Sequence, residues 1–356
     1  MSMERRTAGG ADRQAADRVS AEEQKLFNQK FDIITEIIGR DQISIKDFQV
    51  NPPSANDFIL DEYAFGRAHT FHTPQERMHN DIRSEQRVLE RINQTPATKT
   101  AVALEYIFGV GVKAGNWLGT RADTRATSTF DDTRYKIDEI VTIENEDEET
   151  PPFGIDVTTS SNPEIVRDKL ERSHNNKALD LPSGCSRLIY YENEEERRSL
   201  PLVPRYVISI SSGFVESIVR SNVHAGKGGL AINQHSPAML NIRHRILSEL
   251  SAQADLRLNQ ISLTPPQEQT DTEADAIDFI GLQKDMFDTA LSEVEALCQE
   301  SSPSLQGLPA GKLRQALIDR QKSSDTAYKT LMNEIASMNE EVKSQKRGQK
   351  ISAIAS

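Results

Sequence analysis

Two aspartates stand inside apolar segments whose composition is typical of β-strands. Asp138 lies within Tyr135–Ile143 and Asp156 within Phe153–Thr159, and both segments are otherwise rich in Ile, Val, Tyr, Phe and Thr. Alternation along a strand places Asp138 on the same face as Ile140. If the two strands pair as a hairpin, we expect the two carboxylates within about 6 Å of each other, close enough to bridge one hard cation. Without a cation their charges repel, so Asp156→Asn is expected to raise the melting temperature in EDTA.

The chemistry that such a pair supports is metal-assisted phosphoryl chemistry. Carboxylate oxygens are hard ligands that suit Mg²⁺ or Mn²⁺, and the ion would polarise a phosphoryl oxygen and lower the pKa of a bound water. A helix expected after Asp156 carries Lys169, which could orient the attacking water or offset charge in the transition state. Upstream, Glu105 lies in an otherwise apolar helix, where a buried acid needs a partner.

Each of these four residues also has a purely structural interpretation. Lys169 could be an ordinary solvated lysine, and Glu105 could pair with a basic residue of the core. The pair Asp131–Asp132 is more typical of a turn than of a ligand pair, and Trp117 is expected to be a packing residue. The two aspartates could be strand-end acids paired with Arg125, Arg134 or Lys136.

The elements that would position these residues predict a mixed α/β core over residues 100–258. An apolar helix is expected over about 100–118, and a helix with good N-terminal signals starts at Pro163 and runs to about residue 175. Strands are expected at 125–129, 135–143, 153–159, 186–191 and 205–211. The order is helix, three strands, helix and two strands, which indicates a mixed sheet.

This arrangement resembles the PD-(D/E)XK nuclease superfamily over residues 100–212. The resemblance is carried by the helix with Glu105, by Phe130–Val141, by Gly154–Thr158 and by the helix with Lys169. It implies a restriction-endonuclease-like, mixed-sheet α/β core and a nuclease that cleaves DNA phosphodiesters.

The resemblance also implies a role for each matching residue. Asp138 and Asp156 match the two acids that bind Mg²⁺ or Mn²⁺, and Glu105 matches the helical acid that assists them. The third-strand pattern of the family is acid, any residue, lysine, and here Thr158 occupies the lysine position. Lys169, on the following helix, is the natural substitute and completes the expected catalytic set with Asp138 and Asp156.

The rest of the chain divides around this core. Residues 1–30 are expected to be a disordered arm and 31–99 a helical N-terminal region. A polar linker over 259–273 precedes a helical hairpin or coiled coil over 274–345, and a basic tail covers 346–356.

Heptad spacing marks the expected C-terminal hairpin. In its first helix Ile280, Phe287 and Val294 recur every seven residues, and apolar residues step by three and four over 328–342 in its second. The two helices either pack on each other or on the core, or they form an intermolecular coiled coil that makes a homo-oligomer.

Composition narrows the possible partners. The 356 residues carry 42 basic and 54 acidic side chains, for a net charge of -12, so DNA binding would need a local basic surface. The stretch from Arg220 to Arg257, with the Gly226–Gly229 turn, is the best candidate for such a surface. Two cysteines, no long apolar run and no signal peptide predict a cytoplasmic protein without a membrane segment.

Three functions remain open on these grounds. The first is a metal-dependent nuclease that acts on DNA. The second is a catalytically inactive nuclease-like fold that serves as a binding or assembly module, which Thr158 and the acidic net charge favour. The third, a small-molecule enzyme of another α/β class, has no supporting motif.

Overall fold

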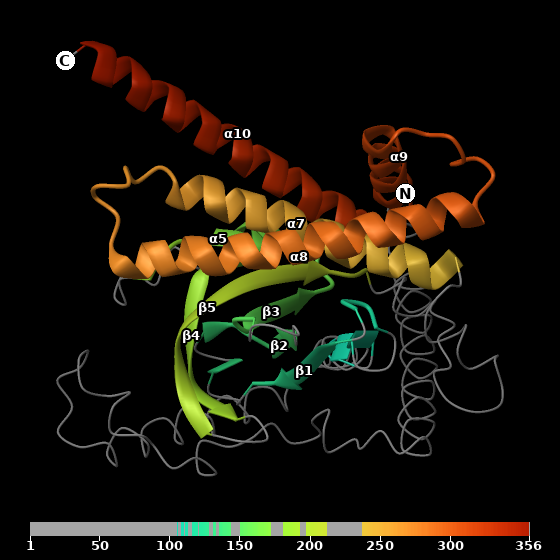
Figure 1. The fold of residues 1–356 in the computed structure, drawn as a ribbon, viewed down its shortest axis with the longest axis horizontal. Coiled ribbons are helices and arrows are strands. Elements are labelled where there is room, and N and C mark those ends of the chain that lie inside the picture. Colours follow the sequence, from blue (N-terminus) through green and yellow to red (C-terminus); the bar gives the residue numbers. More distant parts are fainter. Residues whose placement is uncertain are drawn as a thin grey trace, which may run out of the picture.

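The computed structural model is a mixed α/β fold with a five-stranded sheet covered by helices (Figure 1). The residues that the structure describes are 105, 108–109, 111–112, 116–119, 121–127, 131–132, 135–143, 150–171, 181–192, 197–211 and 237–355. The predicted arm and N-terminal helical region and the Gly226–Gly229 turn lie outside them. No helix within the described ranges is long and apolar enough to cross a membrane.

The sheet has the strand order β1-β2-β3-β5-β4. The strands β1, β2 and β3 form an antiparallel meander, β5 runs parallel to β3, and β4 pairs antiparallel with β5 at the edge. Helix α5 (Pro163–Glu171) lies in the connection from β3 to β5. The strands span Ala122–Ala126, Glu139–Ile143, Phe153–Thr158, Cys185–Glu192 and Arg197–Ser209 in chain order.

Every predicted strand overlaps an observed one, but several predicted ends are wrong. The segment 135–138 is not part of β2, because Tyr135 is helical and Lys136 has a left-handed backbone with φ of 57°. Asp138 therefore lies directly before β2 rather than inside it. The opening helix ends earlier than the predicted residue 118, since Asn116 has φ of 50° and Trp117 is in a turn.

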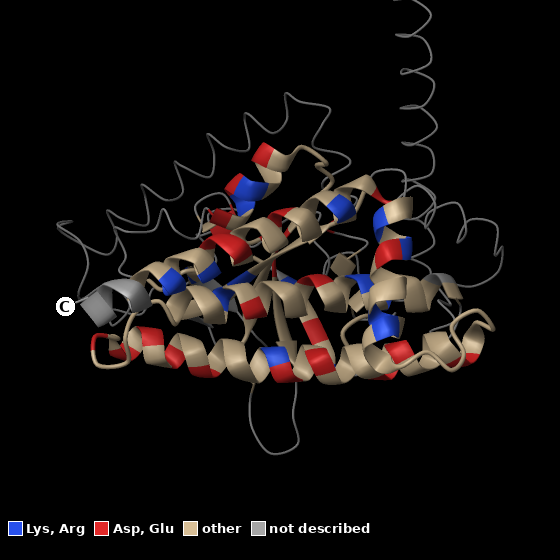
Figure 2. Ribbon diagram, turned by 90° about the horizontal axis from the view of Figure 1, so that it is seen from above, with Lys and Arg blue, Asp and Glu red and all other residues tan. Residues whose placement is uncertain are grey.

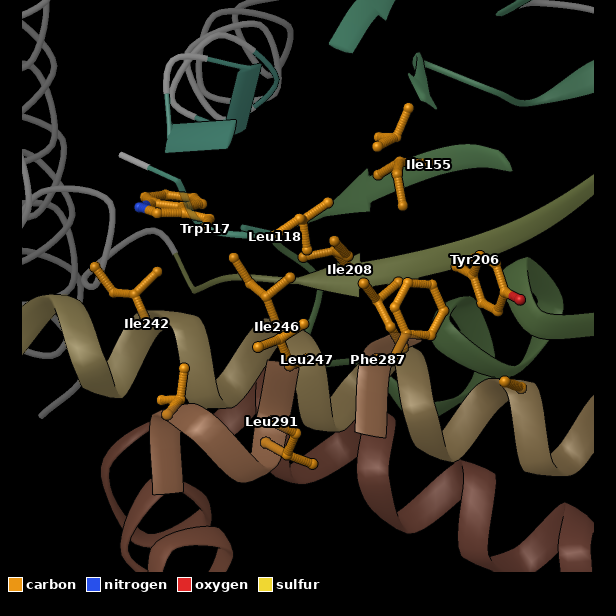
Figure 3. Close-up of a cluster of buried hydrophobic side chains, with 14 of the residues drawn as sticks. Trp117, Leu118, Ile155, Tyr206, Ile208, Ile242, Ile246, Leu247, Phe287 and Leu291 are labelled. Atoms are coloured by element: carbon orange, nitrogen blue, oxygen red, sulfur yellow. The ribbon is translucent and has the colours of Figure 1, made fainter. Parts of the chain in front are cut away.

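The main core lies between the sheet and two long helices, α7 (Pro237–Ile261) and α8 (Asp271–Ser301), as Figure 3 shows. Phe153 of β3 and Tyr206 of β5 meet Phe287 of α8 edge to face, with ring centroids 5.3–5.6 Å apart. Trp117 is fully buried and donates to the Met239 sulfur at 2.9 Å, which confirms its expected packing role.

The opposite face of the sheet is covered by α5 and by α10 (Thr326–Ala355). Val207 of β5 contacts this second layer, and it points away from the neighbouring Tyr206 because side chains alternate along a strand. The other buried members of this layer are Val166, Leu170, Leu256, Leu331, Ile335, Met338 and Val342.

Helix α7 covers the edge of β5 that β4 leaves free. The Gln253 amide accepts from the Val207 N–H at 2.8 Å and donates to the Val207 carbonyl at 2.6 Å. One turn earlier Glu249 accepts from both the backbone and the hydroxyl of Ser209, and Arg245 donates to the Ser209 carbonyl. Spacing of four residues places these three side chains on one face, so α7 replaces the missing neighbour strand.

The C-terminal helices number three in the described residues instead of the two of the expected hairpin. Helix α9 (Ala310–Ser324) comes between α8 and α10 along the chain. Helix α10 continues to Ala355, through the residues expected to form the basic tail. The heptad residues of α8 and α10 are buried against the core of their own chain. The two cysteines are buried as free thiols, in keeping with the expected absence of a disulfide framework.

Candidate functional site

Asp138 and Asp156 occupy opposite positions on adjacent segments. The antiparallel register pairs Glu139 with Ile155, and the Asp138 N–H donates to the Ile155 carbonyl at 2.8 Å. The Asp138 carboxylate then accepts from the Val157 N–H at 2.7 Å, so the side chain continues the hydrogen-bond ladder where the strand ends. The register thus brings the two predicted metal ligands to neighbouring positions.

Lys169 reaches this pair from the last turn of α5. Its ammonium contacts the Asp156 carboxylate and donates to the Val157 carbonyl at 3.1 Å. The lysine side chain is 20% exposed, so it is not the solvated surface lysine that the sequence left open. Helical side chains lean toward the N-terminus of their helix, which carries the ammonium back toward the end of β3.

Arg205 is a fourth member of the site that the sequence reasoning missed. It lies within the buried half of β5 and is 2% exposed, and its guanidinium contacts the second oxygen of Asp156. Both oxygens of Asp156 are therefore bound by cations. The sequence does contain a signal for Arg205. A single arginine beside an apolar run predicts a buried charge that needs a partner, just as a single aspartate within such a run does.

Two further acids, Glu105 and Asp132, form an acidic group with Asp138. Burial, and then the charge of Asp138, raises the pKa of Glu105 to about 8. Burial and the charge of Glu105 raise the pKa of Asp132 to about 6, although the charge of Lys136 and a hydrogen bond with Asp138 oppose the rise. The pKa of Asp138 lies well above its ordinary value because of burial and the charges of Asp156 and Asp132. The group holds more negative charge than its surroundings neutralise.

The neighbouring pair Asp131–Asp132 splits between two roles. Asp131 is fully buried and accepts from the Ile189 N–H of β4 at 2.9 Å, which is a structural role. Asp132 belongs instead to the acidic group, and because both residues are helical, the expectation of a turn is wrong for the pair.

Asp156 titrates in the opposite direction from Asp138. Burial alone would raise its pKa, but the positive charges of Lys169 and Arg205 hold the pKa below its ordinary value. Asp156 is thus an ionised acid in a buried ion-pair cluster. The expectation that Asp156→Asn would relieve repulsion and raise the melting temperature is no longer tenable, because the substitution would leave the buried Arg205 and the partly buried Lys169 without a counter-charge.

The carboxylates of the site are of the chemical type that binds a hard cation, but their positions suit such an ion only partly. No group of three or more His, Cys, Asp or Glu side chains among the described residues is placed to hold a metal ion. Glu105 and Asp138 supply the oxygen ligands that Mg²⁺ prefers, and a cation would relieve the repulsion that raises their pKa values. Asp156 could join them only by exchanging one of its two cationic contacts.

The basic stretch predicted to contact DNA is largely internal. Arg243, Arg245 and Arg257 are 9%, 2% and 1% exposed, so that part of the prediction is wrong. Arg220 and Lys227 lie outside the described residues. The surface above the sheet is acidic along α8, as Figure 2 shows, with exposed Asp271, Asp275, Asp278, Asp285, Glu293 and Glu300.

Comparisons with known proteins return no match: no family model, no curated protein and no solved structure is similar to this chain. What the site can do has therefore to be inferred from its own residues and geometry.

Proposed function

We propose that the protein is a Mg²⁺-dependent nuclease that cleaves DNA phosphodiesters with a PD-(D/E)XK-like site. The observation that carries the proposal is the contact of Lys169 with Asp156, next to Asp138. A lysine absent from its usual strand position, where Thr158 stands, is replaced from the following helix. The order of three antiparallel strands, helix α5 and the parallel strand β5 supports the same assignment.

The bound ion would be held by Asp138 and Asp156, with Glu105 assisting, and Mn²⁺ would suit the same oxygen ligands. When bound, it would polarise the phosphoryl oxygen and lower the pKa of a water. Lys169 keeps Asp156 ionised and places a positive charge where the transferring phosphoryl group gains negative charge. The burial of Asp156 and Arg205 limits water around these charges and strengthens their interactions.

Incubation of the purified full chain with linear and circular DNA tests this proposal, in Mg²⁺, in Mn²⁺ and in EDTA. Lys169→Met is expected to slow cleavage about 100- to 1,000-fold, as for the loss of one preorganised charge donor, with metal affinity little changed. Lys169→Arg should not restore the rate, because a guanidinium does not reproduce a compact ammonium.

A matched control is Lys284→Met on α8. Lys284 also pairs with an aspartate, Asp288, at 2.5 Å, but both residues belong to α8 and neither is part of the candidate site. This variant should cleave as the parent does. Absence of cleavage with either ion, or full activity of Lys169→Met, would contradict the proposal.

The second candidate is a catalytically inactive nuclease-like module that binds or assembles with other molecules. The double engagement of Asp156 by Lys169 and Arg205 favours it, because a neutralised carboxylate is a poor metal ligand. Isothermal titration of the chain with Mg²⁺ and Mn²⁺ separates the two candidates. Binding that Asp138→Asn weakens supports the nuclease, and no binding supports the inactive module.

A further inference from the structure

We propose that Arg205 is the positioning residue of this site, a single buried guanidinium that sets the places of Asp138, Asp156 and Lys169 together. Its consequence for catalysis rests on the proposed function, whereas its effect on the three residues does not. Three contacts of one side chain carry the inference, and they reach three separate segments of the chain.

The first segment is the turn that delivers Asp138. The Arg205 Nε donates to the Lys136 carbonyl at 2.7 Å. Lys136 has φ of 57°, a left-handed conformation that is unfavourable for a residue with a side chain and needs support from its surroundings. Asp138 follows two residues later, so the direction in which its carboxylate points depends on this turn.

The second and third segments are β3 and α5. The same terminal nitrogen of Arg205 contacts the Asp156 carboxylate and donates to the Lys169 carbonyl at 3.0 Å. Carbonyls in the last turn of a helix lack intrahelical partners and favour a nearby cation. Lys169 is therefore linked to Arg205 in two ways: its carbonyl accepts from Arg205, and its ammonium binds Asp156, which Arg205 also binds.

Only arginine provides this arrangement. The planar guanidinium donates in several fixed directions and stays charged when buried, whereas an ammonium is a single compact charge. A lysine at position 205 could neutralise Asp156 and reach the Lys169 carbonyl, as one terminal nitrogen of Arg205 does, but its single nitrogen could not also replace Nε at the Lys136 carbonyl.

Arg257 of α7 offers a matched control. It is also a fully buried arginine, and it donates to the Leu170 carbonyl at 3.0 Å, in the same turn of α5. Within the described residues its other hydrogen bond goes to Gln260 at 3.4 Å and not to an acid of the site. The two arginines thus share the stabilisation of α5, and only Arg205 touches the acid.

The experiment compares Arg205→Gln and Arg205→Lys with Arg257→Gln and Arg257→Lys in the full chain. The pKa of Asp156 is followed by carbon NMR of labelled aspartates, with its signal assigned by loss in Asp156→Asn. Arg205→Gln should raise this pKa by about one unit or more, since an opposite charge within contact distance is removed. Arg205→Lys should keep it low, and neither Arg257 variant should move it.

Cleavage of linear DNA in Mg²⁺ gives the second readout. Both Arg205 variants should lower kcat about 100-fold with KM for DNA unchanged, as for other losses of a preorganised charge arrangement. The Arg257 variants should lower the melting temperature without this change in kcat.

Several outcomes would overturn the proposal. They are an unchanged Asp156 pKa in Arg205→Gln, an equal shift in Arg257→Gln, or full kcat in Arg205→Lys. If both Arg205 variants fail to fold while both Arg257 variants fold, Arg205 supports the fold and not the site. If the parent does not cleave DNA but the Asp156 shift is found, the proposed nuclease function fails and the hold of Arg205 on Asp156 stands.

Discussion

Two clusters of buried polar and charged side chains contact β5: the candidate site and a group on α7. They differ in the groups to which their side chains bind. On α7, Gln253, Glu249 and Arg245 each bond a backbone group of the free edge of β5. Arg245 also pairs with Asp325 at 2.7 Å, and Asp325 accepts from the hydroxyl of Ser211. These polar side chains satisfy backbone groups in the part of β5 that β4 leaves unpaired, which would otherwise be buried without partners.

In the candidate site, positive and negative charges are distributed differently. Asp156 is compensated twice, by Lys169 and Arg205. The pKa of Glu105 is raised by burial and by the charge of Asp138, and the pKa of Asp138 is raised by burial and by the charges of Asp156 and Asp132. Glu249 in the α7 cluster also has a raised pKa, about 7, but its cause is burial, and its neighbour Arg245 opposes the rise. Acids that raise one another's pKa beside a buried cation are the arrangement expected of a functional site, whereas saturated backbone contacts indicate a structural one.

The largest expected effect separates the two aspartates of the site. Asp156→Asn leaves Lys169 and Arg205 without a counter-charge, so it should cost about 3–5 kcal/mol of unfolding free energy and abolish Mg²⁺-dependent cleavage. Asp138→Asn resembles the protonated acid that its raised pKa already favours, so it should change stability by less than about 1 kcal/mol at neutral pH. Urea unfolding in EDTA measures both, and equal costs would mean that the two acids do not differ.

The second effect breaks the α7 cluster. Gln253→Leu removes both partners of the Val207 backbone, and each buried unsatisfied group costs about 1–3 kcal/mol, so a loss of about 3 kcal/mol is expected. The exposed Gln315→Leu on α9 is the control and should change stability by less than about 0.5 kcal/mol. The DNA cleavage rate of Gln253→Leu, measured below its melting temperature, should match the parent. A large loss of rate would mean that the two clusters are not independent.

The third effect is a dependence of stability on pH. The pKa of Glu105 rises from 4.5 to about 8 on folding, so the folded chain keeps a proton that the unfolded chain loses in this window. Unfolding free energy therefore falls as pH rises from about 4.5 to about 8. Glu105→Gln cannot titrate, so its stability should fall less over this range and exceed that of the parent at pH 8. Parallel profiles for parent and variant, from denaturant unfolding at each pH, would contradict the raised pKa.

The smallest expected effect on stability is that of a substitution in the α7 cluster. Glu249→Gln keeps an amide oxygen that accepts from Ser209, and the Glu249 pKa of about 7 leaves this acid partly neutral at pH 7. A change within about 1 kcal/mol is expected at pH 7. Its pH profile should differ from that of the parent as pH rises from about 4.5 through about 7, since the folded parent loses the Glu249 proton as pH passes its pKa of about 7. Mg²⁺ should alter the stability of this variant as it does that of the parent.

Sequence pattern predicted a strand near each of the five observed ones, although several ends were wrong, and it pointed to four residues of the candidate site, Glu105, Asp138, Asp156 and Lys169. Apolar runs broken by single charges marked Asp138 and Asp156, and the helix signals at Pro163 placed Lys169 within reach of them. The same pattern misassigned the arginines of α7, because Arg245 and Arg257 carry charge that the fold uses internally. Spacing shows which residues share a face, and it says nothing of the segment that the face will meet.

The sequence by itself determined the local elements, since periodicity, Pro163 at a helix start and β-branched runs act over a few residues. The tertiary structure alone decided which acid is ionised, because that depends on charges brought from far along the chain. Asp156 meets Arg205 only through the parallel pairing of β3 with β5, and Asp138 meets Asp132 and Glu105 only once the opening helix packs beside the sheet. Protonation is set by distance and burial in space, and neither is encoded in local spacing.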